Sequence, residues 1–293
     1  MTLLDPHLQQ RLARVRIRTQ HAQPFRGIGD RRSRKQGPGM EFADHRPYQF
    51  GDDIRYLDQH AYSRLRQHHV KLFSLHQSLE ITVLLDASAS MGFGQPEKYT
   101  FAASLAAALT YIGLAGGDAV TVGTLSDGSV SWFHRLTGVQ RSRELFSWLQ
   151  KRRPTGATRL ADAARASANR LPVSGLVIVL SDWLDVDFDA VVRLLAAAGQ
   201  EVVGVQVLAP EEMEPERLGM GAARLIDAED GDALLEMPLD PSVFESYRRE
   251  LEAVRFELAQ ALTRRGGRYL LARSDERLAR VLLHDWRSKG FLR

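Results

Sequence analysis

The residues of this chain that are best suited to chemistry carry oxygen and stand in three short segments. The first is Asp86-Ala87-Ser88-Ala89-Ser90, the second is Thr155-Gly156-Ala157-Thr158, and the third begins at Asp182. Carboxylate and hydroxyl oxygens are hard ligands that suit Mg²⁺ or Mn²⁺, with waters completing an octahedral shell. Because only two carboxylates belong to the set and no Glu is at hand, a bound ion would stay electrophilic toward a carboxylate from another molecule. The set therefore predicts an adhesion site in preference to a catalytic one.

The predicted secondary structure brings these segments to one edge of a sheet. Runs rich in Val, Ile and Leu at 80–86 and 176–180 are typical of parallel strands that are buried on both faces. Asp86 ends the first run, Asp182 follows the second, and Thr158 leads into a predicted helix. Since ligands bind at the carboxyl ends of the strands in such sheets, we expect these side chains to meet there.

Strands and helices alternate along most of the chain, which predicts an α/β protein with a doubly wound, mostly parallel sheet. We expect an N-terminal segment at 1–77, with a short helix and a basic Gly-rich loop, and a sheet domain at 78–293. A β-hairpin near 223–237 is expected as an insertion before the penultimate helix. Further strands are expected at 119–125, 130–133, 202–208 and 269–272, and helices at 99–113, 141–151, 161–170, 188–198, 242–264 and 276–289.

The composition excludes several classes of protein. The chain has 293 residues, of which 44 % are apolar and 26 % are charged, as in ordinary globular proteins. The absence of Cys excludes disulfides, thiol catalysis and Cys-ligated zinc or iron–sulfur sites. No apolar stretch reaches the roughly 20 residues of a membrane span, and the N-terminus lacks the pattern of a secretory signal. We therefore expect a cytoplasmic protein without a membrane span.

The oxygen-bearing segments resemble a known motif. A pattern of Asp-x-Ser-x-Ser followed by a later Thr and a later Asp is similar to the metal-ion-dependent adhesion site of von Willebrand factor A domains. The resemblance covers about residues 78–290, with Thr158 as the matching Thr and Thr155 as the weaker candidate. It implies a Mg²⁺ site, with Mn²⁺ or Ca²⁺ as alternatives, whose ligands are Asp86, Ser88, Ser90, Thr158 and Asp182. An Asp or Glu of a protein partner would then take the open coordination position.

A second resemblance lies before the sheet domain. Residues 37–48 read Gly-Pro-Gly-Met-Glu-Phe-Ala-Asp-His-Arg-Pro-Tyr, and residues 51–58 read Gly-Asp-Asp-Ile-Arg-Tyr-Leu-Asp. With Val-Lys-Leu-Phe at 70–73, they are similar to the signature of the bacterial family called domain of unknown function 58, although Gln59 stands where that family has Trp. The resemblance implies a MoxR-type AAA+ ATPase or its client as partner. It also implies an adaptor or chaperone-like role and no catalysis by the chain itself.

Two other functions remain as alternatives. A Mg²⁺-dependent phosphohydrolase would use the same oxygen cluster, but it needs a general base and a deep pocket, and no His or Glu stands near the cluster in sequence. Nucleic-acid binding would use the Arg-rich stretch at 11–35, since residues 1–71 hold fourteen Lys or Arg against seven Asp or Glu. No nucleic-acid-binding module accompanies that stretch, so this alternative is disfavoured.

Overall fold

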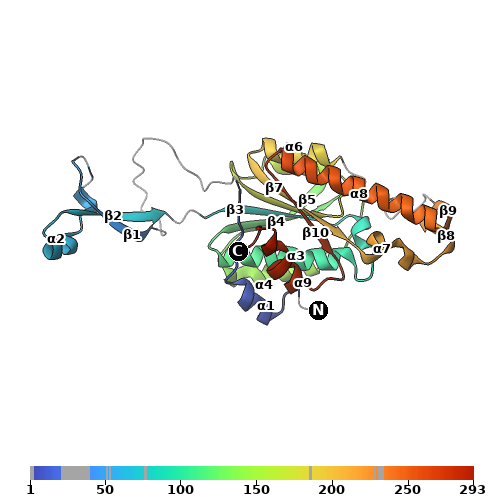
Figure 1. Cartoon of the computed structure of the whole chain (residues 1–293), viewed down its shortest axis with the longest axis horizontal. Coiled ribbons are helices and arrows are strands. Elements are labelled where there is room, and N and C mark those ends of the chain that lie inside the picture. The colour runs from blue at the N-terminus through green and yellow to red at the C-terminus, as the bar shows by residue number, and fades with distance from the viewer. Residues whose placement is uncertain are drawn as a thin grey trace. The chain divides into compact units, whose positions relative to one another are not determined.

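The computed structural model describes residues 3–20, 40–50, 52, 54–75, 78–184, 187–226, 229 and 234–293 (Figure 1). The chain forms two compact units, a larger one of Met1–Pro24 with Leu79–Arg293 and a smaller one of Phe25–Ser78. The sequence analysis assigned the first helix to the N-terminal segment. The structure instead includes this helix, α1 (Pro6–Leu12), in the larger unit, because Leu4, Leu12 and Val15 are buried in the core of that unit.

A six-stranded sheet forms the centre of the larger unit. Its order is β10-β7-β6-β3-β4-β5, and each neighbouring pair is parallel except β4 with β5. The predicted α/β class with a mostly parallel sheet is therefore confirmed. The strands are β3 (Glu80–Asp86), β4 (Ala119–Ser126), β5 (Ser129–Thr137), β6 (Gly175–Ser181), β7 (Gln200–Leu208) and β10 (Arg268–Arg273).

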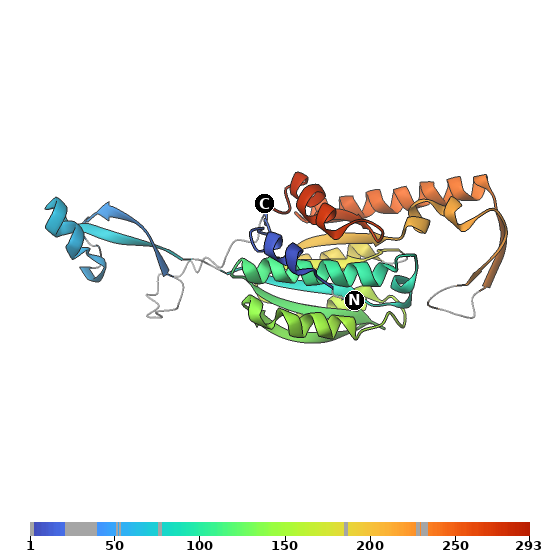
Figure 2. The ribbon, with the colours of Figure 1, turned by 90° about the horizontal axis from the view of Figure 1, so that it is seen from below.

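Helices cover both faces of this sheet, as a doubly wound fold requires (Figures 1 and 2). Besides α1, the helices of the larger unit are α3 (Lys98–Ala115), α4 (Ser142–Gln150), α5 (Leu160–Ala168), α6 (Phe188–Ala197), α7 (Pro210–Met213), α8 (Pro241–Arg264), α9 (Leu278–Arg280) and α10 (Trp286–Ser288). A π-helical turn at Val281–Asp285 joins α9 to α10, so the single helix expected at 276–289 is interrupted there. Short 3₁₀ turns occur at Ala89–Gly92, Val139–Arg141 and Pro215–Leu218.

The central strands are largely apolar because both of their faces are buried. In β3, Ile81, Val83 and Leu85 belong to the core that contains α3. Leu84 points the other way and belongs to a second core with residues of α5, α6 and α8. A strand between two cores has no solvent-facing side, so its sequence shows a continuous apolar run without alternation.

The order of the strands places a switch point at β3. From β3 the chain passes through α3 to β4, whereas the next parallel strand, β6, pairs with the opposite side of β3. Open α/β sheets bind ligands in the crevice outside the carboxyl ends of the strands at such a point. The residues that follow β3 and β6 are therefore in the position where this fold carries a site.

An antiparallel hairpin and a long helix extend beyond the carboxyl ends of the sheet strands (Figures 1 and 2). The hairpin pairs β8 (Gly221–Ile226) with β9 (Leu234–Leu239), where the sequence predicts one near 223–237. Asp240 then caps α8, because its side chain accepts hydrogen bonds from the backbone N–H groups of Ser242 and Val243. The cap starts the helix directly after β9.

The smaller unit consists of β1 (Met40–Pro47) paired antiparallel with β2 (His69–Leu75), with a 3₁₀ turn at Ile54–Tyr56 and α2 (Gln59–Leu65) between them in sequence. Asp58 caps α2 and also contacts His45 at 2.6 Å. Of the Arg-rich stretch at 11–35, residues 21–35 lie outside the described part of the chain. No helix in the described ranges combines the length and apolar character of a membrane span.

The C-terminal residues provide a test of how the larger unit is stabilised. Phe291 is fully buried and contacts Trp286 with ring centroids 5.8 Å apart. We expect Phe291→Ala to lower the free energy of unfolding by about 3–5 kcal/mol, because the substitution leaves a cavity in the core. Phe256→Ala is the matched control, since that ring is 64 % exposed, and it should change the value by less than about 1 kcal/mol. Urea unfolding followed by circular dichroism measures both, and equal effects would contradict this packing.

Candidate functional site at the carboxyl edge of the sheet

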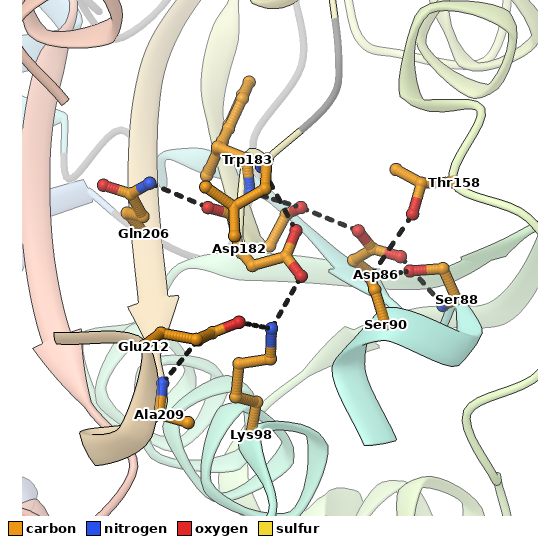
Figure 3. Close-up of polar contacts among 12 residues, drawn as sticks. Asp86, Ser88, Ser90, Lys98, Thr158, Asp182, Trp183, Gln206, Ala209 and Glu212 are labelled. Atoms are coloured by element: carbon orange, nitrogen blue, oxygen red, sulfur yellow. Dashed lines mark hydrogen bonds and ion pairs between the residues drawn. The ribbon is translucent and has the colours of Figure 1, made fainter. Parts of the chain in front are cut away.

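Asp86 is the last residue of β3 and forms the buried base of the site (Figure 3). Its side chain accepts hydrogen bonds from the Ser88 backbone N–H at 2.9 Å and from the Ser181 hydroxyl at 2.7 Å. Asp86 is only 1 % exposed. Burial, together with the negative charge of Asp182, raises the pKa of Asp86 to about 6. An added positive charge would therefore stabilise the ionised carboxylate of Asp86.

Three hydroxyl groups lie beside Asp86 at distances that suit a small cation. The Ser88 Oγ and Ser90 Oγ atoms are 3.1 Å apart, and Ser90 Oγ is 3.5 Å from Thr158 Oγ1. Oxygens that bind Mg²⁺ at about 2.1 Å in adjacent octahedral positions are about 3 Å apart, by the geometry of a right angle. The hydroxyl spacing therefore fits neighbouring ligands of one hard cation.

Backbone hydrogen bonds hold the Thr158 loop against the loop that follows β3. The Thr155 N–H donates to the Ala87 carbonyl at 2.8 Å, and the Ala89 N–H donates to the Gly156 carbonyl at 2.9 Å. Gly156 has φ +77°, a conformation that glycine adopts without strain. Thr155 contributes to the site through its backbone and Thr158 through its hydroxyl, so Thr158 is the better candidate ligand of the two.

Asp182 lies directly after β6 and forms a buried ion pair that the sequence analysis did not predict. Lys98 Nζ donates to Asp182 Oδ2 at 2.8 Å and to Glu212 Oε1 at 2.5 Å (Figure 3). The Lys98 side chain is 2 % exposed. Burial alone would lower the pKa of Lys98, but the charges of the two carboxylates raise it, so the ammonium keeps its proton. Asp182 is therefore compensated by a cation of the chain itself.

Trp183 and Gln206 hold the backbone at Asp182. The Gln206 side-chain amide donates to the Asp182 carbonyl at 2.8 Å, and the Trp183 indole N–H donates to the Val205 carbonyl at 3.2 Å. The Trp183 N–H donates to the Ser181 hydroxyl, which itself donates to Asp86. Trp183 is fully buried with φ +57°. These bonds fix the backbone at Asp182 and Trp183, and through Ser181 they connect that backbone to the Asp86 carboxylate.

Glu229, between β8 and β9, reaches the site and corrects the expectation that no Glu is available there. The Thr158 N–H donates to Glu229 Oε2 at 2.7 Å, and the Thr158 hydroxyl donates to Glu229 Oε1. A hydroxyl that donates its proton to a carboxylate keeps its lone pairs free for a cation. Glu229 thus orients Thr158, and it adds a carboxylate to the pocket that Asp182 also lines.

All five predicted ligands converge at one edge: Asp86, Ser88, Ser90, Thr158 and Asp182. In the described part of the chain, no three His, Asp or Glu side chains form a cluster that could hold a metal ion. An ion at this edge would therefore depend on the serine and threonine hydroxyls. The donor set suits a hard divalent cation, with Asp182 partly engaged by Lys98.

Signals for two of the missed residues are present in the sequence. Lys98 is in the first turn of α3, where a positive charge opposes the helix dipole, so a compensating carboxylate could have been expected. Glu212 follows β7, and the strand-end rule that identified Asp182 applies to it as well. Nothing in the local pattern places Glu229, because its approach to Thr158 depends on the path of the hairpin.

The raised pKa of Asp86 predicts a pH-dependent stability in the presence of a chelator. The folded pKa is about 6 against an unfolded value of 3.8, so the folded state binds a proton more tightly. Stability should then fall as the pH rises from about 4 to 6 and stay level above that, by about 3 kcal/mol in total. Asp86→Asn removes this titration. In urea unfolding between pH 4 and 7.5, the unfolding free energy of the variant should rise by about 3 kcal/mol relative to that of the wild type as the pH increases. Plots of unfolding free energy against pH that run parallel for the two proteins would contradict the assignment.

Removal of the Lys98 charge should destabilise the metal-free fold. Lys98→Met keeps an unbranched side chain but leaves the buried carboxylates of Asp182 and Glu212 without their cation. We expect a loss of about 3–5 kcal/mol in unfolding free energy at pH 7. Lys151→Met, at an exposed position, is the control and should stay within about 0.5 kcal/mol of the wild type. If both variants unfold alike, the ion-pair network does not support the fold.

Three comparisons connect the chain to known proteins. "Uncharacterized protein Rv1480" of Mycobacterium tuberculosis is 29 % identical over 280 residues, which cover 92 % of this chain and 86 % of that protein. The crystal structure of the conserved hypothetical protein BatB from Bacteroides thetaiotaomicron has a TM-score of 0.44 and 17 % identity, over 67 % of this chain and 91 % of that one. The SpRpn10 VWA domain has a TM-score of 0.37 and 10 % identity, over 69 % and 91 %.

A family model gives the assignment. It matches residues 44–256, which include β3, the Thr158 loop, β6 and the hairpin. The signature predicted from 37–48 and 51–58 overlaps the start of that match. The chain belongs to the family described as protein of unknown function DUF58.

Proposed function

We propose that this protein is a metal-dependent protein–protein interaction module. The observation that supports the proposal is the convergence of two buried aspartates and three hydroxyls at the switch point of the sheet, with hydroxyl spacings of 3.1 and 3.5 Å. Ser88 and Ser90 would hold Mg²⁺ directly, Thr158 directly or through water, and Asp86 and Asp182 partly through water. Mn²⁺ and Ca²⁺ are the alternative ions. The ion would supply an electrophilic position that accepts an Asp or Glu of the partner.

The charge of this edge explains why a cation is needed for such a partner. Among the described residues, the carboxylates of Asp86, Asp182, Glu212 and Glu229 lie at this edge, and the ammonium group of Lys98 pairs with those of Asp182 and Glu212. A surface with this excess of negative charge repels an acidic group, and the repulsion is strong because most of these groups are shielded from water. A bound dication reverses the local field at the point of contact. Acidic partners should therefore bind only when the metal is present.

By the family resemblance, the partner in this proposal is a MoxR-type AAA+ ATPase or its client. The chain would then act as an adaptor or chaperone-like component in the cytoplasm and not as a catalyst.

A phosphohydrolase is the second candidate, and two observations favour it. Glu229 reaches Thr158 and could serve as a general base, and a pocket of about 980 Å³ opens beside the site. Among the described residues that line this pocket, however, Lys98 is the one base, and it is already paired with two carboxylates. A phosphate dianion would meet mainly carboxylates and apolar groups there. The interaction module is therefore the function that the geometry supports best.

Thr158→Val tests the proposal with a control in the same loop. It removes the hydroxyl that approaches Ser90 but keeps the size of the side chain. We expect Mg²⁺ or Mn²⁺ affinity, measured by titration calorimetry, to fall at least about tenfold, and capture of a purified MoxR-type ATPase to fall with it. Thr155→Val is the control, since Thr155 acts through its backbone, and it should retain both activities.

Two outcomes would contradict this proposal. Capture of the ATPase that persists unchanged in excess chelator would show that the metal is not needed. Metal-dependent turnover of p-nitrophenyl phosphate that is lost in Asp86→Ala would assign the cluster to an enzyme. Unfolding curves of each variant separate a loss of binding from a loss of fold.

A further inference from the structure

The pocket beside the oxygen cluster has walls that the proposed metal site does not use. Its volume is about 980 Å³, and it opens next to Ser90, Thr158 and Asp182. Residues of α7, the 3₁₀ turn at Pro215–Leu218 and the N-terminal half of α8 form most of its lining. These are the elements that extend beyond the sheet (Figure 2). The pocket is therefore formed mostly by elements outside the sheet, and it is continuous with the oxygen cluster at the sheet edge.

The walls of the pocket are apolar and partly open to solvent. Phe93 is 41 % exposed, Leu218 is 48 % exposed and Tyr247 is 37 % exposed, and all three line the pocket. Val243 and Phe244 contribute further apolar surface from the first turns of α8. Exposed apolar side chains gathered around one recess are typical of a surface that another molecule covers.

Carboxylates stand among these apolar walls, and Glu211 and Glu250 form no ion pair with any residue that the structure describes. Asp182 and Glu212 share Lys98. In the described part of the chain, Glu250 forms no ion pair, although it lines the pocket. Glu211 Oε1 accepts the Gln95 N–H at 3.3 Å, whereas Glu211 Oε2 is buried without a hydrogen-bond donor among the described residues. A buried carboxylate oxygen without a donor is costly, so a donor from outside the chain would be stabilising.

The phenol of Tyr247 lines the same pocket as these carboxylates. Burial, with the negative charges of Glu212 and Asp182, raises the pKa of Tyr247 to about 12. A cation in the pocket would relieve the same potential that disfavours ionisation of this phenol.

We propose that this pocket receives an Arg or Lys side chain, carried between apolar residues, from a segment of a protein partner. The long aliphatic stem of such a side chain would cover Phe93, Leu218 and Val243, and its charged end would reach Glu211 and Glu250. The charge of the pocket excludes acidic segments, and its continuity with the metal edge allows one partner segment to use both places. The inference rests on the proposed function only in taking the partner to be a protein.

Selection of peptides from a random 12-residue phage-display library tests this proposal on the full chain in Mg²⁺. We expect the enriched peptides to carry Arg or Lys flanked by apolar residues. Val243→Trp places a bulkier ring on the pocket wall and should abolish this enrichment while the unfolding curve stays cooperative. Enriched peptides without a basic residue, no enrichment at all, or the same enriched peptides with Val243→Trp would overturn the proposal.

An enriched peptide then measures the contribution of the charge. In fluorescence anisotropy, Glu250→Gln should weaken its binding about tenfold, the effect of one lost charge-assisted hydrogen bond. Glu252→Gln is the matched control, because Glu252 is an exposed residue of the same helix that does not line the pocket, and it should change affinity less than about twofold. Equal effects of the two substitutions would contradict the assigned site.

The same peptide separates this inference from the proposed function. If a basic peptide binds equally in Mg²⁺ and in chelator and loses affinity with Glu250→Gln, the pocket is assigned and the metal is not needed for it. If binding requires Mg²⁺ but ignores Glu250→Gln, the metal-dependent function stands and the pocket proposal fails. A dimer of the chain that dissociates with Glu250→Lys would assign the pocket to a second copy and overturn the proposal.

Discussion

The burial of two aspartates at the ends of adjacent parallel strands is the constraint on which the rest of this structure depends. β3 and β6 are neighbours, so Asp86 at the end of β3 and Asp182 just after β6 lie at the same edge, and each is 1 % exposed. The negative charge of Asp182 makes ionisation of Asp86 less favourable. The fold compensates them differently, since Lys98 pairs with Asp182 whereas Asp86 is stabilised by hydrogen bonds from Ser181 and Ser88. Asp86 is therefore the group that gains most from an added cation.

Lys98 also links the three segments of chain that follow β3, β6 and β7. It begins the helix that follows β3, its first partner follows β6, and its second partner, Glu212, lies in the short helix after β7. An ammonium in the first turn of a helix is opposed by the helix dipole, so the two carboxylates must supply the stabilisation. The same ion pairs thus hold the edge together and set its electrostatic potential, and structural and binding roles fall on the same residues.

The elements outside the sheet add a pocket beside the oxygen cluster, so that two kinds of binding surface lie next to each other. The hairpin brings Glu229 to Thr158, and the N-terminal half of α8 adds apolar walls and the carboxylate of Glu250. The hard oxygen cluster suits a cation and an acidic group, whereas the pocket suits a basic group on an apolar stem. Because the two places are adjacent, one partner segment with both charges would be recognised more selectively than a single acidic residue.

Local patterns were enough to predict the α/β class and the place of the two aspartates, because both follow from strands that are buried on both faces and from the residues at their ends. The runs at 80–86 and 176–180 identify β3 and β6, and Asp86 and Asp182 stand at or just after the ends of those strands. The ion pair of Lys98 and the contact of Glu229 with Thr158 were beyond such patterns. They join residues 84 and 71 positions apart and depend on the path that each connection takes outside the sheet. Hydrophobic periodicity reports which face of an element is buried, but not which distant side chain lies against it, and only the folded chain decides that.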